Sequence, residues 1–343
     1  MTDVTIRGAG IFGLSIAWAC QKRGARVRVI DPNGIAAGSS GGIVGALAPH
    51  VPENWNSKKA FQFESLLMAE AFWAEISAHT DVQTGYTRAG RLQPIADAHT
   101  LDLAAQRSEN AKSLWQGQAE WSVITSPPDA WHPLSPTGAW ISDTLSAHIH
   151  PRRACMALAD ALTTCGVTIA SEGDAKGPTV WATGWDGLIA LGQGYPRPLG
   201  NGVKGQAALL DIDMSGCPQL FADGVHIVPH LDGTVAIGST SENQFTSPHE
   251  TDDLLDAVLE KARRHVPRLA TAQVIKTWAG VRPRARSRAP MLGPWPDRPG
   301  HFIANGGFKI GFGMAPKIAE VIADLILENR DEIPHDFRVS ASL

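Results

Sequence analysis

A short arginine-rich segment carries the clearest side chain for binding a charged substrate. The run from Trp278 to Arg288 contains four arginines at alternating positions. Arg282 follows the apolar residues Trp-Ala-Gly-Val and precedes Pro283, which restricts the backbone. A guanidinium held in this way can bind a carboxylate through its planar fork of N–H groups. We therefore expect Arg282 to bind an anionic substrate, whereas the other three arginines are expected to lie along a solvated edge.

A second stretch, near the N-terminus, has backbone groups suited to phosphate. Gly8-Ala-Gly-Ile-Phe-Gly13 stands between a β-like run, Val4–Arg7, and an apolar stretch from Leu14 to Cys20. In such a strand–turn–helix unit the first glycine permits the tight turn, the second lets a pyrophosphate approach the backbone and the third lets helix and strand pack closely. A second β-like run, Val27–Ile30, ends at Asp31, eighteen residues after the third glycine, where a carboxylate can accept hydrogen bonds from ribose hydroxyls. The pattern predicts a dinucleotide site and leaves FAD and NAD both open.

Three further segments are suited to lie against a flat ligand. The stretch from Gly34 to His50 is rich in small residues and too apolar for a solvated linker. Ala182-Thr-Gly184 follows a β-like run, and in an open α/β sheet ligands bind at the carboxyl ends of the strands. The glycine-rich segment Gly306–Gly313 precedes a helix expected from about Ala315 to Leu327, whose free N–H groups would stabilise negative charge on a ligand.

The elements that must position these residues follow from apolar periodicity and turn signals. One hairpin is predicted, Val225–Leu231 with Thr234–Gly238, in which Asp232-Gly233 forms a two-residue turn. Helices are predicted over 57–78 (N-cap Ser57), 97–115, Arg152–Cys165 (followed by Gly166) and 250–265 (capped by Thr251, with Leu254, Leu255, Val258 and Leu259 on the buried face).

Strands alternating with helices at both ends of the chain predict an α/β fold, or α+β when the middle of the chain is included. Residues 1–80, 142–198 and 278–343 are expected to form one doubly wound, Rossmann-like domain that holds the dinucleotide. Two β-rich regions, 81–141 and 199–277, interrupt it and are expected to form an interleaved, mainly antiparallel second domain.

Composition excludes several classes of partner and location. The chain has 343 residues, 43% hydrophobic and 19% charged, with a net charge of −4, which suggests neither a nucleic acid nor an anionic membrane surface as partner. The apolar stretch from Gly8 to Cys20 is too short to span a bilayer and carries the phosphate turn, so neither a transmembrane segment nor a signal peptide is expected. The four cysteines show no CxxC and no metal-ligand spacing, which favours reduced thiols, no metal and a cytoplasmic location.

Taken together, five stretches resemble the D-amino acid oxidase family of flavoproteins, in particular its glycine oxidase and sarcosine oxidase branches. They are spread over nearly the whole chain: Gly8–Asp31, Ser39-Ser40 through Gly45-Ala46-Leu47, Ala182-Thr183-Gly184-Trp185, Trp278–Pro283 and Gly306–Pro316. The resemblance implies a β-rich domain that covers the flavin and shapes the substrate pocket. It also implies non-covalent FAD, because no cysteine lies near Met291 to tether the cofactor.

The resemblance further implies which residues contact FAD. The adenosine ribose would meet Asp31, the pyrophosphate would meet the glycine turn with Ser39 and Ser40, and the isoalloxazine would lie between Val44–Leu47 and Gly307–Gly313. The full set of expected cofactor residues is Gly8, Gly10, Ile11, Phe12, Gly13, Asp31, Pro32, Ser39, Ser40, Val44, Gly45, Ala46, Leu47, Ala182, Thr183, Gly184, Trp185, Gly307, Lys309, Ile310, Gly311, Phe312 and Gly313.

Three side chains are assigned to catalysis by the same resemblance. Arg282 matches the family arginine that binds the substrate carboxylate, and Lys309 matches a second cationic position. His226 stands where glycine oxidases and D-amino acid oxidases usually have a tyrosine that lines the pocket, and Ala46 would line the substrate pocket as well. The histidine leaves the identity of the amino acid open, and the short interval from Cys165 to Thr179 leaves the adenine contacts unplaced.

The expected reaction is oxidation of the C–N bond of a small amino acid, which could be glycine, a D-amino acid or an N-alkyl amino acid. Hydride would pass to flavin N5, the imine would be hydrolysed, and oxygen or another electron acceptor would reoxidise the flavin. Two alternatives remain, and the oligomeric state stays open. One is an FAD-containing subunit of an amino acid dehydrogenase complex. The other is an NAD-dependent dehydrogenase, which does not explain the Ala182–Gly184 strand end or the Gly306–Gly313 turn.

Overall fold

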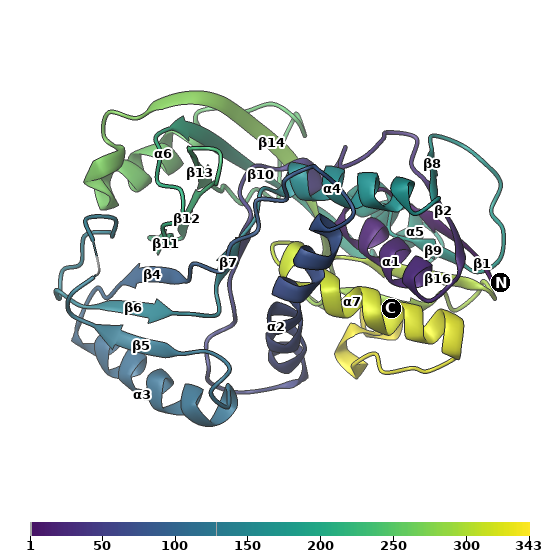
Figure 1. Cartoon of the computed structure of the whole chain (residues 1–343), viewed down its shortest axis with the longest axis horizontal. Coiled ribbons are helices and arrows are strands. Elements are labelled where there is room, and N and C mark those ends of the chain that lie inside the picture. The colour runs from purple at the N-terminus through teal and green to yellow at the C-terminus, as the bar shows by residue number, and fades with distance from the viewer. Residues whose placement is uncertain (1, 128) are drawn as a thin grey trace.

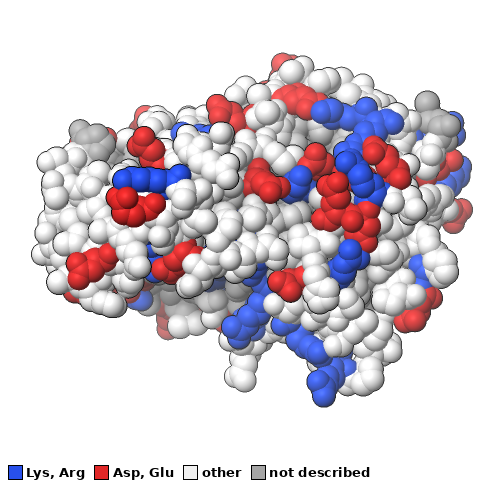
Figure 2. Space-filling view, turned by 90° about the horizontal axis from the view of Figure 1, so that it is seen from below, with Lys and Arg blue, Asp and Glu red and all other residues white. Residues whose placement is uncertain are grey.

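The computed structural model of the chain describes residues 2–127 and 129–343 and has an α/β fold, as predicted. Its strands form a six-stranded sheet, an eight-stranded sheet and a two-stranded sheet. Figure 1 shows the six-stranded sheet with helices α1 (Ile11–Lys22) and α7 (Gly311–Glu328) toward one end of the long axis, and α3 (Ala98–Leu114) at the other. On the face drawn in Figure 2, acidic and basic side chains are interspersed, so that face carries no field of a single sign.

The six-stranded sheet contains the predicted strand–turn–helix unit. Parallel pairing joins five of its strands, and one edge strand is antiparallel. In spatial order they are β15 (Met291–Pro294), β16 (His301–Asn305), β9 (Thr179–Trp181), β1 (Asp3–Arg7), β2 (Arg26–Ile30) and β8 (Thr168–Ala170). The first and second β-like runs of the sequence are therefore neighbours, with their carboxyl ends at one edge of the sheet.

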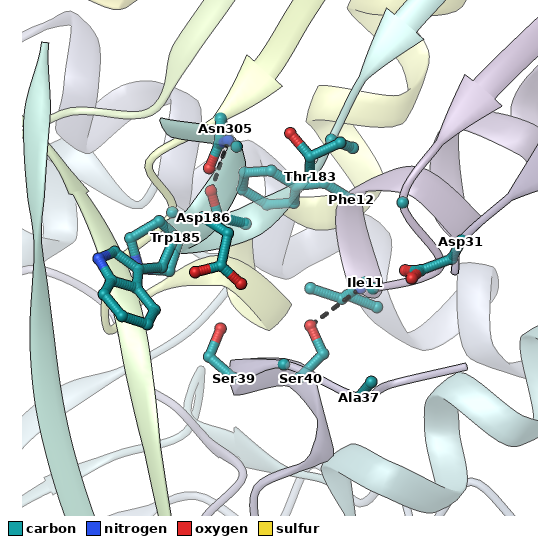
Figure 3. A pocket seen from close by; sticks show the side chains of 18 of the residues that line it. Ile11, Phe12, Asp31, Ala37, Ser39, Ser40, Thr183, Trp185, Asp186 and Asn305 are labelled. Carbon is teal, nitrogen blue, oxygen red and sulfur yellow. Dashed lines mark hydrogen bonds between the residues drawn. The ribbon is translucent and has the colours of Figure 1, made fainter. Parts of the chain in front are cut away.

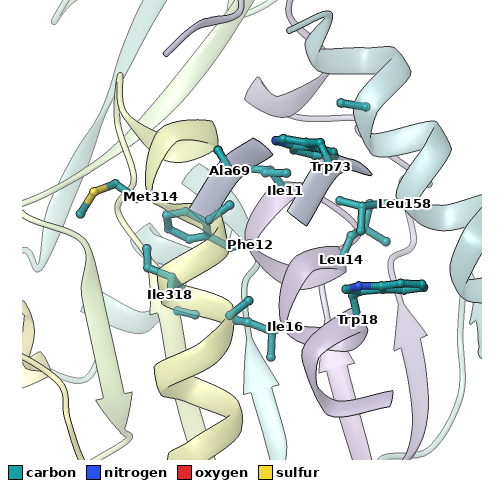
Figure 4. Close-up of a cluster of buried hydrophobic side chains, with 14 of the residues drawn as sticks. Ile11, Phe12, Leu14, Ile16, Trp18, Ala69, Trp73, Leu158, Met314 and Ile318 are labelled. Atoms are coloured by element: carbon teal, nitrogen blue, oxygen red, sulfur yellow. The ribbon is translucent and has the colours of Figure 1, made fainter. Parts of the chain in front are cut away.

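Four helices pack together against this sheet to form the largest core. They are α1, α2 (Ser57–Ser77), α4 (Pro151–Thr164) and α7. In Figure 4, Leu14 and Trp18 of α1 lie among Trp73 of α2, Leu158 of α4 and Ile318 of α7. Each of these five side chains is at most 2% exposed, so burial of the apolar stretch after the glycine turn fixes the turn relative to α7.

The eight-stranded sheet is mainly antiparallel, as predicted for the β-rich middle of the chain. Its order is β14 (Gln273–Ala285), β10 (Gly200–Asp211), β13 (Thr234–Gly238), β12 (Val225–Pro229), β11 (Gln219–Ala222), β4 (Arg91–Pro94), β6 (Trp140–Asp143) and β5 (Trp121–Ile124). Only β11 and β4 pair in parallel within it. Helix α6 (Leu254–His265) packs on β10, β12 and β13, and α3 packs on β5. The domain boundaries remain a prediction, and both β6 and β14 cross one of them.

The described chain also contains two further short strands and one further helix. Strand β3 (Ala46–Leu47) pairs with β7 (Ala147–His148) in the small antiparallel sheet, which holds the small-residue segment after β2 against the rest of the chain. Helix α5 (Gly184–Gly192) begins where β9 ends, and Ser39–Gly41 form a 3-10 turn. No helix in the described ranges combines the length and apolar character needed to cross a membrane.

The predicted helices over 57–78, 97–115 and Arg152–Cys165 are confirmed, with small changes at the ends. The N-cap of α2 is Asn56 and not Ser57, because the Asn56 side chain accepts a hydrogen bond from the N–H of Lys59 at 3.1 Å. Gly166 follows α4 as predicted, and its N–H bonds to the carbonyl of Thr163 at 2.9 Å.

Two predictions about the second half of the chain are wrong in detail. The hairpin between β12 and β13 has no two-residue Asp-Gly turn. The N–H of Gly233 bonds to the carbonyl of His230, and Gly233 has φ of +79°, so the loop has three residues and ends in a left-handed glycine. Helix α6 begins at Leu254 without a cap by Thr251, because Asp252 accepts the Leu254 N–H at 3.0 Å, and Leu254 is 51% exposed.

Helix α7 also starts earlier than predicted, at Gly311 and not near Ala315. The sequence suggested that Pro316 stands close to the helix start, but it lies inside the helix, where its ring removes one backbone hydrogen bond. The glycines at 311 and 313 are therefore part of the first helical turn. The N-terminal N–H groups of α7 consequently lie closer to Lys309 than the sequence indicated.

Candidate active site

A cavity of about 650 Å³ lies over the carboxyl ends of β1, β2 and β9. Its wall includes the glycine turn and the first residues of α1 (Figure 3). Gly8 has φ of +111°, and a Cβ at this position would lie 2.2 Å from the carbonyl oxygen of Ala182. Only glycine can therefore bring the turn this close to the end of β9, and the approach leaves the α1 N-terminus facing the cavity.

The acidic residue after β2 also faces this cavity. The Asp31 carboxylate accepts hydrogen bonds from the N–H of Ala9 at 2.7 Å and from the N–H of Asn33 at 2.9 Å. These bonds tie the glycine turn to the end of β2. A carboxylate accepts more hydrogen bonds than these two, so Asp31 can still receive hydroxyl donors from a ligand in the cavity.

A serine hydroxyl occupies the N-terminus of α1. Ser40 accepts a hydrogen bond from the N–H of Ile11 at 3.0 Å, as Figure 3 shows, and no side chain of the N-cap Gly10 is present to do so. The N–H groups and dipole of a helix N-terminus stabilise negative charge. Ser39 and Ser40 together with this helix end therefore form a site suited to phosphate oxygens.

The end of β9 forms the opposite wall. Thr183, Trp185 and Asp186 lie around the cavity in Figure 3, and the Asn305 side chain donates to the carbonyl of Gly184 at 2.9 Å. This bond joins the end of β16 to the start of α5. The Ala182–Trp185 segment is thus held in place by a neighbouring strand.

A second, smaller cavity of about 100 Å³ adjoins the first. Both are lined by Ile11, Ser39, Ser40, Phe308 and Gly311. The remaining wall of the small cavity consists of Gly42, Val44, Gly45 and Ala46 with Pro151, Ala207, Trp278, Arg282, Lys309 and Phe312. The two cavities together connect the phosphate-type site to two cationic side chains.

Strand β14 positions Arg282 in the small cavity. Its guanidinium donates to the Ser239 hydroxyl at 2.6 Å and to the carbonyl of Thr240 at 3.4 Å. Burial lowers the pKa of Arg282 to about 10, and the nearby Glu242 carboxylate opposes that shift. The group remains charged at neutral pH. A Cβ on Gly205, across the sheet, would lie 2.0 Å from a guanidinium nitrogen, so the guanidinium occupies space that any other residue would fill.

Lys309 supplies a second cation beside Arg282. Burial and the charge of Arg282 both lower the pKa of Lys309. Among the described residues, no carboxylate lies within 4.0 Å of either side chain to form an ion pair. The backbone bridge between Arg284 and Gly307, and the bond from the Phe308 N–H to the Pro283 carbonyl at 2.9 Å, tie the two segments together. The two cations are therefore held on backbone segments that are joined to each other.

His226 lies near these cations on β12. The pKa of His226 is lowered to about 3. Burial is the largest cause, and the positive charges of Arg91, Lys309 and Arg282 lower the pKa further. The imidazole is therefore neutral at physiological pH, and its Nδ1 is buried without a hydrogen-bond partner. His226 is not among the residues that line either cavity, and its ring centre lies 4.6 Å from that of Phe221 with the rings tilted by 44°.

The structure brings most of the predicted site residues to the two cavities. The large cavity collects Gly8, Gly10, Ile11, Phe12, Asp31, Pro32, Ser39, Ser40, Ala182, Thr183, Gly184, Trp185, Gly307 and Gly311, and the small one adds Val44, Gly45, Ala46, Arg282, Lys309 and Phe312. Gly13, Leu47, Ile310 and Gly313 line neither cavity. Leu47 is 1% exposed in the hydrophobic core, since alternation along β3 points it away from Ala46.

A profile of FAD-dependent oxidoreductases, the DAO family, matches residues 3–325 of the chain. The protein belongs to this family. The match covers both the glycine turn and the cationic pair, so the expected resemblance is confirmed and the NAD-dependent alternative is not favoured.

Several members of the DAO family are similar over the length of the chain. The bifunctional protein ThiO/ThiG of Nostoc sp. is 26% identical, over 96% of this chain and 53% of the relative, so the chain spans about half of that protein. Glycine oxidase of Geobacillus kaustophilus is 22% identical over 94% of this chain and 92% of the relative. Its crystal structure superposes with a TM-score of 0.84, 19% identity and 99% of both chains covered. Iminodiacetate oxidase of Chelativorans sp. has a TM-score of 0.83 at 21% identity, covering 96% of this chain and 97% of that one.

The residues at the site fit the FAD of this family. At Gly8 there is no room for a Cβ. The large cavity presents a helix N-terminus and serine hydroxyls for phosphate oxygens, and it adjoins the small cavity that contains Arg282 and Lys309. Asp31 retains acceptor capacity for ribose hydroxyls. The glycine turn, Ser39, Ser40 and Asp31 would hold the phosphates and ribose of this dinucleotide, and the adjoining cavity with Arg282 and Lys309 would be open to its other end.

Sequence reasoning missed several residues that line the cavities. They are Arg7, Trp181, Asp186, Trp278, Asn305 and Phe308, among others. One of them had a visible signal, because Arg7 is a charged residue at the end of the otherwise uncharged run Val4–Ile6 and directly precedes the glycine turn. The others depend on which face of a strand or turn meets the cavity, and no local pattern specifies that.

Proposed function

We propose that the protein oxidises the C–N bond of a small amino acid with bound FAD. The observation that carries the proposal is the pair of cations, Arg282 and Lys309, in a cavity of about 100 Å³ that opens into the dinucleotide cavity. Two neighbouring cations without carboxylate partners repel each other, so a bound anion stabilises both. A small amino acid as substrate is in accord with relatives named glycine oxidase and iminodiacetate oxidase.

The chain contributes binding and orientation to this reaction. Bound FAD would supply the hydride acceptor for the α-carbon of the substrate. Arg282 and Lys309 hold the carboxylate through charge-assisted hydrogen bonds, so the α-carbon is presented in one orientation. Val44, Gly45 and Ala46 line the same cavity. The N-terminus of α7, which starts at Gly311 between the two cavities, would stabilise negative charge on the bound cofactor.

His226 is a neutral, polar side chain in the neighbourhood of the cationic pair. Because the pKa of His226 is lowered to about 3, it adds no third positive charge to the pocket at pH 7. The amine of the substrate must enter without its proton for hydride to leave the α-carbon. The neighbouring charges of Arg282 and Lys309 favour that form, because positive charge lowers the pKa of a nearby amine.

The proposed function is tested by anaerobic reduction of the bound flavin with a panel of amino acids. We expect glycine, N-alkyl glycines or small D-amino acids to bleach the flavin of the protein on its own. Arg282→Ala should lower kcat/KM on the order of 100-fold by removing the charge-assisted fork. Arg286→Ala, which alters an exposed arginine of the same segment, is the matched control. Failure of every amino acid to bleach the flavin would refute the proposal.

The electron acceptor is a separate question. Oxygen is the acceptor that the oxidase names of the relatives suggest, and a respiratory carrier is the alternative. A peroxide-coupled assay run beside an artificial dye acceptor separates the two. The division of the chain into cofactor and substrate domains, and a cytoplasmic location, are part of the same proposal. The location is supported by four cysteines that form no disulfide.

A further inference from the structure

An arginine that plays no part in the proposed chemistry lines the dinucleotide cavity. Arg7 ends β1 and directly precedes the glycine turn. Its neighbour Ile6 is fully buried toward α1, since a Cβ on Gly13 would touch the Ile6 side chain at 3.2 Å. Alternation along the strand therefore points Arg7 to the opposite face of the sheet. The cavity reaches from the α1 N-terminus over the strand ends to this arginine.

The surroundings of Arg7 hold the guanidinium in place without neutralising it. Its guanidinium carbon lies 5.2 Å from the ring centre of Trp181, the residue paired with Arg7 on β9. No carboxylate among the described residues lies within 4.0 Å of it. The Arg7 Nε is buried and has no hydrogen-bond partner. A buried, unpaired donor on a charged group is costly unless a ligand satisfies it.

Arg28 on the adjacent strand β2 provides the contrast. Register pairs Arg28 with Thr5, two residues before Arg7, so both arginines project from the same face of the sheet. Arg28 donates to the carbonyl of Asp174 at 3.2 Å and does not line the cavity. This hydrogen bond joins Arg28 to the connection between β8 and β9. Arg7 has no such protein partner, although it stands closer to the phosphate-type site.

We propose that Arg7, supported by Trp181, binds the adenosine diphosphate half of FAD. This half carries the diphosphate charge and the ring and ribose acceptors that an unpaired guanidinium needs. Asp31 and Ser40 stand at the same cavity and would contact the ribose and phosphates of the same half. The connection between β8 and β9 is short and contributes none of its residues from 171 to 178 to the cavity wall. Arg7 thus supplies a contact that this connection leaves out.

The inference rests on FAD being the cofactor. Its test measures the affinity of the apoprotein for FAD and does not measure turnover. Binding of FAD to the apoprotein is followed by quenching of flavin fluorescence for the natural protein, Arg7→Leu, Arg7→Gln and the control Arg28→Leu. We expect both Arg7 variants to bind FAD about 10-fold more weakly or worse, since they lose a charge-assisted contact. Arg28→Leu should bind FAD as the natural protein does. Arg7→Gln serves if Arg7→Leu fails to fold.

A second titration identifies the half of FAD that is contacted. ADP alone should displace FAD from the natural apoprotein, and this competition should weaken in the Arg7 variants. Riboflavin, which lacks the adenosine diphosphate half, should bind equally to all variants. Three results would each overturn the inference: unchanged FAD affinity in both Arg7 variants, an equal loss in Arg28→Leu, or an equal loss for riboflavin. Because no substrate is used, the outcome is independent of whether the protein oxidises amino acids.

Discussion

A single methyl group on Gly205 provides a sharp test of the role of Arg282. Gly205 lies on β10 and pairs with Gly280 of β14. In Gly205→Ala the added Cβ would lie 2.0 Å and 2.1 Å from the two terminal nitrogens of Arg282 and 2.2 Å from its central carbon. Ordinary contact begins near 3.4 Å, so the guanidinium must move by more than about 1 Å. The charge stays in the protein, but its position changes.

The magnitude follows from what this movement breaks. The 2.6 Å hydrogen bond to Ser239 is lost, and the carboxylate of the substrate is held in a shifted position. A misplacement of about 1 Å costs on the order of 100-fold in rate. The clashing atoms belong to the far end of a flexible side chain, so the strand pairing can remain. We therefore expect kcat/KM to fall about 100-fold with the melting temperature and FAD content nearly unchanged.

Steady-state kinetics with the best amino acid of the panel, together with anaerobic flavin reduction, measure this effect. Gly194→Ala, where a Cβ meets nothing within 4 Å, is the control for a glycine-to-alanine change. Wild-type kcat/KM in Gly205→Ala, alongside a strong defect in Arg282→Ala, would show that the guanidinium position is unimportant. That result would refute the reasoning that the carboxylate is oriented by a fixed fork.

Three other expectations follow from the structure. Ser239→Ala should raise KM about 10-fold by removing the 2.6 Å bond to Arg282, as measured by initial rates, and an unchanged KM would contradict this positioning role. Gly8→Ala should yield colourless, less stable protein, because its Cβ would lie 2.2 Å from a backbone oxygen at a φ of +111°; a yellow preparation with normal melting would be the opposing result. Burial lowers the pKa of both His148 and His150 to about 4, and the charge of His230 contributes to each shift. Below about pH 6.5 these histidines therefore bind protons in the unfolded chain but remain neutral in the folded chain. The free energy of unfolding should fall as the pH drops from 6.5 toward 4, by on the order of 2 kcal/mol per histidine at pH 5. Urea unfolding at pH 7 and pH 5 measures this loss, which should shrink in His148→Phe.

The cofactor end of the fold could be predicted well from the sequence. A strand, a glycine turn and an apolar helix are local features, and each is specified by residues close together in the chain. Helices α2, α3 and α4 were likewise visible from periodicity. The spacing from the turn to Asp31 even placed the carboxylate that bonds the Ala9 N–H at 2.7 Å.

The chemistry of the pocket was less accessible because it depends on contacts between distant segments. Ser239 and Thr240 hold Arg282 from a neighbouring part of the sheet, more than 40 positions earlier in the chain. Gly205 leaves the space that the guanidinium of Arg282 fills, and no sequence pattern around Gly205 predicts this contact. His226 was expected at the pocket wall, whereas it lines neither of the two cavities. Helix α7 begins earlier than predicted, because Pro316 lies inside the helix. A proline can be tolerated there where packing stabilises the neighbouring helical turns.

The backbone bridge between Arg284 and Gly307 has a consequence for how this enzyme can diversify. It couples the strand of Arg282 to the turn of Lys309, so a backbone change in either segment displaces both positive charges together. Recognition of the carboxylate is thereby resistant to gradual drift. Adaptation to a different amino acid is open at Ala46, which lines the same cavity and is the residue expected to line the substrate pocket. Libraries aimed at new substrates should therefore vary Ala46 and leave the bridged segments intact.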